Sequence, residues 1–255
     1  SGEYNLSSFV TDNNRVMTLD QLKNVEKPKV ITRNYNSKVA KSINNKNYDK
    51  VRDLIDKCDD KEIVNIWDSL ENKITIGSVT EQKTAHYSVK NKTINFNLYE
   101  DIKGNSFKEP FEILFHESGH AIDNELGNIY KFSRKGRSST SRNYSGGYKN
   151  GLFAKTRKSE VGTVSSKFNE IKNLPLKTRA NLSDIVEGAT KGEVNFGVGH
   201  SKNYWKNDLK GELLASETFA EMFDSTFSNK KSLEAIKKYL PKSYKVFRSM
   251  IKEIQ

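Results

Sequence analysis

Hydrophobic residues recur at helical spacing in the first well-patterned part of the chain, which begins at Tyr48. The apolar positions of this part are Val51, Leu54, Ile55 and Cys58, followed by Ile63, Ile66, Trp67 and Leu70. This periodicity predicts two short amphipathic helices. Residues 1–45 lack it, and we expect them to form a loosely ordered lead-in with one short strand around Val30 to Thr32.

Three segments then alternate apolar and polar residues, which is typical of strands with one buried face. They are "KITIG" (73–77), "AHYSV" (85–89) and "TINFNL" (93–98). The last two flank "KNK", so they predict a hairpin in a small mixed or antiparallel sheet. We expect an edge strand at 93–98, either as an ordinary sheet edge or as the place where a peptide adds as an extra strand.

The pattern becomes helical after residue 110. Pro110 suits a first helical turn, and Gly127 is expected to end the helix. Its apolar stripe consists of Phe111, Leu114, Phe115, Gly119 and Ile122.

Residues 128–200 form a long insertion with helices predicted near 161–172 and 182–190, followed by the Gly-rich "GEVNFGVGH" (192–200). Further helices are predicted at 208–227, 230–239 and 242–253, with Pro241 between the last two. No repeat or linker interrupts the pattern. We therefore expect one α+β domain over 46–255, with a mobile middle and a mostly helical C-terminal half.

Composition describes a soluble globular protein of 255 residues, with 35% hydrophobic and 29% charged residues and a net charge of +11. We expect no membrane-spanning segment, and the N-terminus lacks the order of a signal peptide. The single cysteine, Cys58, excludes an internal disulfide framework. The excess of positive charge makes nucleic acid a candidate partner through the basic segment 131–149, but a solvated loop is the favoured interpretation.

The stretch "EILFHESGHAIDNE" (112–125) places two histidines four residues apart within a predicted helix. Residues at this spacing are offset by about 40° and rise by about 6 Å, so His116 and His120 can reach one ion. Zinc accepts imidazole nitrogen, and Glu117 could take a proton from a water that the metal acidifies. The alternative is a helix whose histidines are only buried and hydrogen-bonded.

A third ligand is expected from the helix "ELLASETFAEMFD" (212–224), because no third histidine follows at the usual distance. Glu217 and Glu221 are four residues apart and share a face, with Asp224 one turn further on. An exposed acidic stripe is the alternative interpretation. The apolar neighbours leave little solvent face, and buried carboxylates need a cation or hydrogen-bond donors.

"LFHESGHAID" followed by "SETFAEMFD" resembles the catalytic domain of anthrax lethal factor and the related clostridial proline-specific endopeptidases. The later segment that starts at "GHSKNYWK" is more similar still to metallopeptidase-like domains of phage minor head (head morphogenesis) proteins. The likeness covers about residues 75–127 and 180–254. It implies a zincin-like fold with Glu217 as third ligand, Glu221 behind it or as an alternative ligand, and Asp123 orienting a histidine.

The chain departs from the lethal-factor pattern at the tyrosine expected seven residues before the glutamate ligand, where it has Lys210. Tyr204 is the predicted substitute as the group that stabilises the oxyanion, and His200 is another candidate. Tyr144 and Tyr148 are further tyrosines that the insertion offers.

The sequence thus predicts a zinc-dependent endopeptidase of phage or mobile-element origin that acts on a peptide or protein in the bacterial cytoplasm or the virion. One alternative is a non-catalytic, zinc-stabilised structural module that contacts phage head components. The other is a secreted toxin-type peptidase.

Overall fold

A computed structural model describes residues 33–79, 84–130, 143–206, 208 and 211–254, together with two short strands near the N-terminus. The chain divides into two compact units, Ser1–Asn34 and Tyr35–Gln255. In the first unit, β1 (Ser8–Val10) pairs antiparallel with β2 (Val16–Thr18). The strand predicted around Val30 lies outside the described residues.

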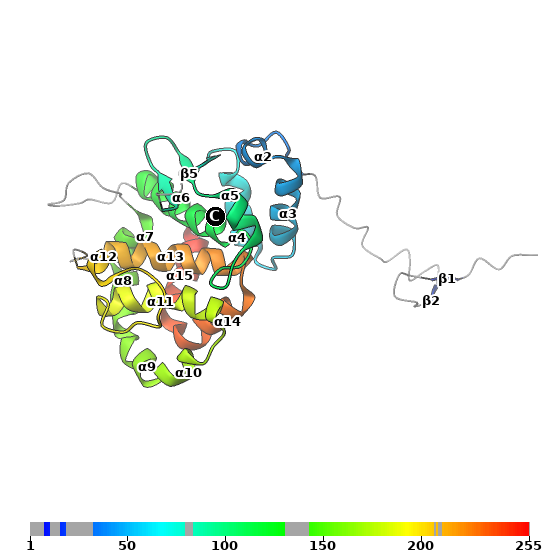
Figure 1. Ribbon diagram of the computed structural model, residues 1–255. Coiled ribbons are helices and arrows are strands. Elements are labelled where there is room, and N and C mark those ends of the chain that lie inside the picture. The colour runs from blue at the N-terminus through cyan, green and yellow to red at the C-terminus, as the bar shows by residue number, and fades with distance from the viewer. Residues whose placement is uncertain are drawn as a thin grey trace, which may run out of the picture. The chain divides into compact units, whose positions relative to one another are not determined.

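The second unit is α+β and mostly helical, with a small three-stranded sheet in its first half (Figure 1). Its elements are α2 (Lys38–Ile43), α3 (Asn45–Asp56), α4 (Lys61–Leu70), β3 (Thr75–Gly77), β4 (His86–Ser88), β5 (Thr93–Asn95), α5 (Leu98–Lys103), α6 (Glu112–Tyr130), α7 (Tyr144–Gly147), η1 (Tyr148–Asn150), α8 (Leu152–Ser159), α9 (Val161–Ser166), α10 (Phe168–Lys172), α11 (Leu176–Thr190), α12 (Lys202–Trp205), α13 (Glu212–Phe227), α14 (Lys230–Tyr239) and α15 (Pro241–Glu253).

The sheet has the order β3-β5-β4 and is mixed. Ile94 of β5 lies opposite Ile76 of the parallel strand β3 and opposite Tyr87 of the antiparallel strand β4. The predicted hairpin is therefore confirmed. The edge predicted at 93–98 is wrong, because the parallel pairing with β3 makes β5 the central strand. Among the described residues, β4 pairs on one side only, so its other side is a free edge.

Helix α2 lies within the segment that the sequence analysis assigned to the loosely ordered lead-in. Its N-terminus is capped by Ser37, whose side chain accepts a hydrogen bond from the backbone N–H of Ala40 at 3.1 Å. Val39, Ala40 and Ile43 are buried. Only three apolar positions mark this helix, and so short a run carries no clear helical period.

The two longest helices, α6 and α13, pack extensively on each other, and α13 lies between α6 and α11 (Figure 1). Gly119 of α6 permits the close approach, because a Cβ atom there would lie 2.7 Å from Cα of Ala220. One turn before Gly119, Phe115 of α6 packs between Trp67 of α4 and Phe227 of α13.

Several predicted helix boundaries differ from the structure. Gly127 does not end α6, which continues to Tyr130; the glycine is buried, and one glycine costs a helix only about 1 kcal/mol. Helix α13 begins at Glu212 rather than at Asp208, because the Asp208 carboxylate accepts hydrogen bonds from the backbone N–H groups of Leu213 and Leu214 at 3.2 and 2.9 Å. Asp208 therefore caps the helix from outside.

The insertion at 128–200 is largely helical where the structure describes it. The helix predicted at 161–172 is split at Lys167 into α9 and α10, and α11 starts at Leu176 rather than near residue 182. The two predicted C-terminal helices are confirmed as α14 and α15.

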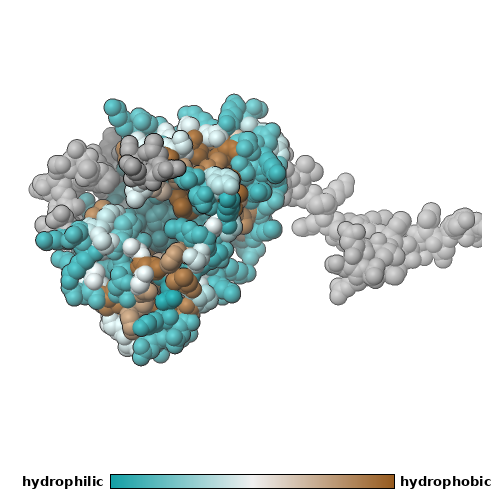
Figure 2. Space-filling view, in the orientation of Figure 1, coloured by the Kyte–Doolittle hydropathy of each residue, from teal (hydrophilic) through white to brown (hydrophobic). Residues whose placement is uncertain are grey.

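Within the described residues, no helix is both long enough and apolar enough to span a membrane. Hydrophilic residues dominate the face seen in Figure 2, with smaller apolar patches between them.

Candidate metal centre

Helix α6 carries both predicted histidine ligands, and its N-terminus is held by a carboxylate from α5. The two oxygens of Asp101 accept hydrogen bonds from the backbone N–H groups of Ile113 and Leu114 at 2.9 and 3.1 Å. Burial raises the pKa of Asp101 to about 6, although these two hydrogen bonds oppose the shift. This cap fixes the start of the helix one turn before His116.

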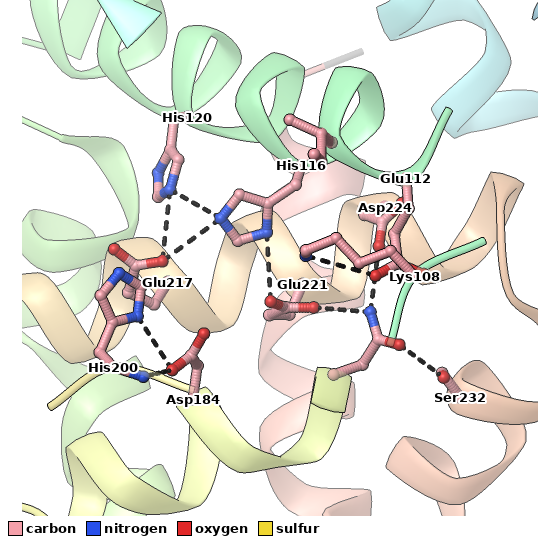
Figure 3. Close-up of polar contacts among 12 residues, drawn as sticks. Lys108, Glu112, His116, His120, Asp184, His200, Glu217, Glu221, Asp224 and Ser232 are labelled. Atoms are coloured by element: carbon pink, nitrogen blue, oxygen red, sulfur yellow. Dashed lines mark hydrogen bonds and ion pairs between the residues drawn. The ribbon is translucent and has the colours of Figure 1, made fainter. Parts of the chain in front are cut away.

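The predicted ligands His116, His120 and Glu217 come together, with one ligand atom from each lying within 4.8 Å of the others. The two Nε2 atoms of the histidines are 3.1 Å apart. Each Nε2 lies 3.4 Å from Oε2 of Glu217 (Figure 3). The close packing at Gly119 positions α13 so that Glu217 can face both rings.

These three separations fit a bound ion. Ligands bonded at 2.0 to 2.1 Å to a tetrahedral ion lie about 3.3 Å from one another. Oε2 of Glu217 is buried and accepts no hydrogen bond of good geometry from the described residues. A buried carboxylate oxygen without a donor is costly, and a cation would satisfy it. Two imidazoles and one carboxylate can therefore hold a metal ion here.

The ring of His116 is held from behind by α13. Its Nδ1 lies 3.2 Å from Oε1 of Glu221 (Figure 3). With Nδ1 as the protonated nitrogen, the lone pair of Nε2 faces Glu217, as metal binding requires. Oε1 of Glu221 thus lies behind His116 and is not among the three converging atoms of His116, His120 and Glu217.

The ring of His120 is held through a hydroxyl. Its Nδ1 lies 3.1 Å from Oγ of Ser216, and this serine also hydrogen-bonds Asp123. The Asp123 carboxylate is fully buried and accepts hydrogen bonds from the backbone N–H and hydroxyl of Ser145 at 2.6 and 2.7 Å. Burial raises the pKa of Asp123 to about 6. Asp123 therefore contacts the predicted ligand through Ser216 and not directly.

The ligands influence one another electrostatically. Burial disfavours the charged ring of His116, but the carboxylates of Glu221 and Glu217 outweigh it and hold the pKa of His116 well above its usual value. Burial likewise disfavours charge on Glu217, yet the two histidines hold the pKa of that carboxyl well below its usual value. Without a metal, the histidines of the site therefore tend to retain a proton, which a bound cation would displace.

Tyr204 and His200, the two candidates for the oxyanion, both line the pocket beside the metal ligands. The hydroxyl of Tyr204 donates to Oε1 of Glu217 at 2.5 Å, and its ring stacks on that of His200 with centroids 4.0 Å apart. Burial, followed by the charge of Glu217, raises the pKa of Tyr204. In this arrangement the Tyr204 proton is engaged by a ligand, so Tyr204 orients Glu217.

His200 is held by Asp184 of α11. Oδ1 of Asp184 lies 2.9 Å from Nδ1 of His200 and accepts a hydrogen bond from its backbone N–H at 2.7 Å. Gly199 permits this turn, since it has φ +109° and a Cβ atom there would lie 2.7 Å from the same oxygen. Burial disfavours the charged ring, but Asp184 and then Glu217 raise the pKa of His200.

The other tyrosines suggested for this role lie elsewhere. Tyr144 and Tyr148 are buried and do not line the pocket, and the hydroxyl of Tyr148 donates to Glu253 at 2.7 Å. Lys210 and residues 131–142 of the basic segment lie outside the described residues.

Two adjoining pockets meet at the ligands. The first, of about 370 Å³, lies between the histidines, Tyr204 and residues 84–87 of the β4 segment. The second, of about 580 Å³, shares His116, Glu117 and His200 with the first. Its apolar walls are Phe107, Ile113, Ala180 and Val198. Glu117 lines both pockets, so a group bound near the ligands can reach it.

Sequence reasoning did not identify Ser216, Asp184 or Asn181, all of which support the ligands or His200. Ser216 directly precedes Glu217, which is a weak signal. Asn181 and Asp184 are polar residues among the apolar residues of α11, and buried polar side chains at such positions need partners.

The chain matches no protein-family model, and no curated protein or solved structure matches it significantly. The resemblance to lethal-factor-like and phage head-associated domains therefore stays a prediction.

Proposed function

We propose that this protein is a zinc-dependent endopeptidase with a zincin-like catalytic domain. The observation that carries the proposal is the convergence of two Nε2 atoms and one carboxylate oxygen at 3.1 to 3.4 Å, where that oxygen accepts no hydrogen bond from the part of the chain that the structure describes. Two histidines and one carboxylate are a donor set typical of catalytic zinc, which keeps a fourth position open. The adjoining pockets provide access to that position.

When bound, zinc would acidify a water molecule and polarise the carbonyl of the bond to be cleaved. Glu117 is suited to accept the proton from the water and return it to the leaving amine, because it lines both pockets next to His116. His200, held by Asp184, is placed to stabilise charge that develops on the carbonyl oxygen. Tyr204 can take this role only by releasing Glu217.

The free edge of β4 is the natural place for an extended peptide to add as a further strand. Residues 84–87 line the first pocket, so such a peptide would pass directly over the ligands. The apolar walls of the second pocket suit an uncharged side chain next to the bond that is cleaved.

The test is metal analysis combined with digestion of a peptide library. Wild-type protein is expected to carry about one zinc per chain and to cleave peptides. Glu117→Gln is expected to keep the zinc and lose cleavage, because only the proton acceptor is removed. Glu125→Gln is the matched control on the same helix, since Glu125 pairs with Lys92 at 2.9 Å outside the pockets.

A wild-type protein that cannot be loaded with metal contradicts the proposal. Cleavage by Glu117→Gln at the wild-type rate contradicts the assigned mechanism. Stoichiometric zinc without cleavage by any variant would instead favour the non-catalytic, zinc-stabilised module.

A further inference from the structure

We propose that Asn181 of α11 is a positioning residue of the metal centre, which acts on His116 through Glu221. This inference rests on the proposed metal site but not on peptidase activity. Asn181 is 2% exposed and touches no ligand directly. The chain of contacts runs from α14 through α11 to α13 and then to α6.

The side-chain amide of Asn181 uses both of its ends. Its Nδ2 donates to Oε2 of Glu221 at 2.8 Å and to Oδ2 of Asp224 at 3.1 Å. Its Oδ1 accepts from the hydroxyl of Ser232 at 2.9 Å and from Nδ2 of Asn229 at 3.5 Å. The partners dictate the orientation, because carboxylates only accept hydrogen bonds and the opposite pair can donate.

Glu221 depends on this donor because of its surroundings. It is 3% exposed, and the neighbouring carboxylates of Glu112 and Asp224 are also buried. The nearby ammonium of Lys108 pairs with Glu112, at 3.4 Å from its Oε1, rather than with Glu221 (Figure 3). A buried carboxylate oxygen that lacks a donor costs roughly 1 to 3 kcal/mol or more. Asn181 supplies a donor at Oε2 of Glu221.

This bond leaves Oε1 of Glu221 to face Nδ1 of His116 at 3.2 Å. The contact between Nδ1 and Oε1 does not have the geometry of a hydrogen bond, but a proton on Nδ1 faces this carboxylate oxygen, and the lone pair of Nε2 then faces Glu217 and His120. If Asn181 were apolar, the Glu221 side chain could turn toward another donor, and the Nδ1 side of His116 would lose the carboxylate that faces it. Asn181 therefore sets the tautomer and ring orientation of His116 indirectly, through the side chain of Glu221.

Asn181 also joins α11 to α14 through Ser232, so a purely structural role must be separated from positioning. A double-mutant cycle does this. The zinc Kd of wild type, Asn181→Leu, Glu221→Gln and the double variant is measured by competition with a chromophoric chelator.

Glu221→Gln is expected to weaken zinc binding by about 10- to 100-fold, and Asn181→Leu by on the order of tenfold. The double variant is expected to bind no more weakly than Glu221→Gln alone, because Asn181 acts through Glu221. Effects that multiply in the double variant would overturn the proposal, as would a wild-type Kd for Asn181→Leu. If Asn181→Leu does not fold, Asn181→Ser carries the same test.

Ser232→Ala is the matched control, since it removes a bond at Oδ1 of Asn181 and keeps both bonds from Nδ2. It is expected to lower the Tm of the metal-free protein while leaving the zinc Kd and the d–d spectrum of the cobalt(II) form unchanged. Asn181→Leu is expected to change that spectrum. Equal changes in both variants would show a merely structural role and overturn the proposal.

Metal binding by the wild type separates a missing metal site from a missing role of Asn181. A wild type that binds neither zinc nor cobalt overturns both. A wild type that binds metal beside an Asn181→Leu variant of equal affinity overturns only the role of Asn181.

Discussion

Helices α6 and α13 present candidate metal ligands to the same point from different environments. On α6, the side chains of His116 and His120 are 13% and 19% exposed toward the pocket. On α13, those of Glu217 and Glu221 are 5% and 4% exposed. An imidazole can be neutral without metal, whereas a carboxylate buried this deeply needs donors or cations. The metal-free protein should therefore depend on the histidines of α6 to compensate the charges of α13.

The largest expected effects come from removing one ligand on each helix. His116→Ala and Glu217→Gln should both abolish stoichiometric zinc binding, because each removes one of three ligands. Their effects on the metal-free protein should differ. His116→Ala removes the cationic ring that Glu217 and Glu221 share and leaves them only their other contacts, so it should lower the free energy of unfolding by about 3 kcal/mol. Glu217→Gln removes a buried charge and should leave the free energy nearly unchanged or raise it.

Chemical denaturation in the presence of a chelator measures this difference. Equal losses of stability in the two metal-free variants would contradict the contrast between the helices. Retention of zinc by Glu217→Gln would instead contradict the assignment of the third ligand.

The next effect concerns the contact between the two helices. Gly119→Ala places a Cβ atom 2.7 Å from Cα of Ala220, so the helices must move apart. We expect a loss of about 2 kcal/mol in the free energy of unfolding and weaker zinc binding, because Glu217 moves with α13. The control is Gly162→Ala in α9, where an added Cβ meets nothing within 4 Å. That variant should be as stable as wild type or up to about 1 kcal/mol more stable.

Similar Tm values for Gly119→Ala and wild type, with unchanged zinc affinity, would show that the helices do not depend on this close approach.

The two helices also differ in how far sequence predicts them. The spacing of His116 and His120 alone predicts two ligands on one face of a helix, because helix geometry fixes their separation. The ligand on α13 requires a pairing between segments far apart in the chain. Glu217 and Glu221 have the same spacing as the histidines, and sequence alone does not decide which of them is the ligand. The structure places Oε2 of Glu217 near both Nε2 atoms and Glu221 at the Nδ1 of His116.

Long-range pairing also explains what sequence reasoning missed. The parallel pairing with β3 makes β5 a central strand, whereas the sequence predicted an edge strand there. Asn181 and Asp184 lie on α11, and their partners Glu221 and His200 come from other elements. Local periodicity predicts that a helix exists but not which buried polar group on it meets a carboxylate of another helix.

A smaller effect should appear at the start of α6, where this helix also depends on a buried carboxylate. The pKa of Asp101 is raised by burial to about 6, against about 3.9 in an unfolded chain. The folded state therefore binds more protons between about pH 4 and pH 6. Stability from this group is fully present below about pH 4 and is lost as the pH rises through 6.

Asp101→Asn removes this titration. The free energy of unfolding of wild type relative to the variant should fall by about 2 kcal/mol from pH 4 to pH 7. Urea denaturation of both proteins across this range measures the change. A relative stability that rises with pH would contradict the raised pKa.

The smallest expected effect tests the hydroxyl through which α13 supports His120 of α6. Ser216→Ala removes the group that lies 3.1 Å from Nδ1 of His120 and that connects the ring to Asp123. Zinc affinity should fall by about tenfold, because the ring loses the acceptor that fixes its tautomer. Ser225→Ala is the matched control on the same helix, since Oγ of Ser225 is buried and has no hydrogen-bond partner among the described residues. A Kd that changes equally in both variants would mean that a buried hydroxyl on α13 affects the site only through packing, and that Asp123 does not support His120.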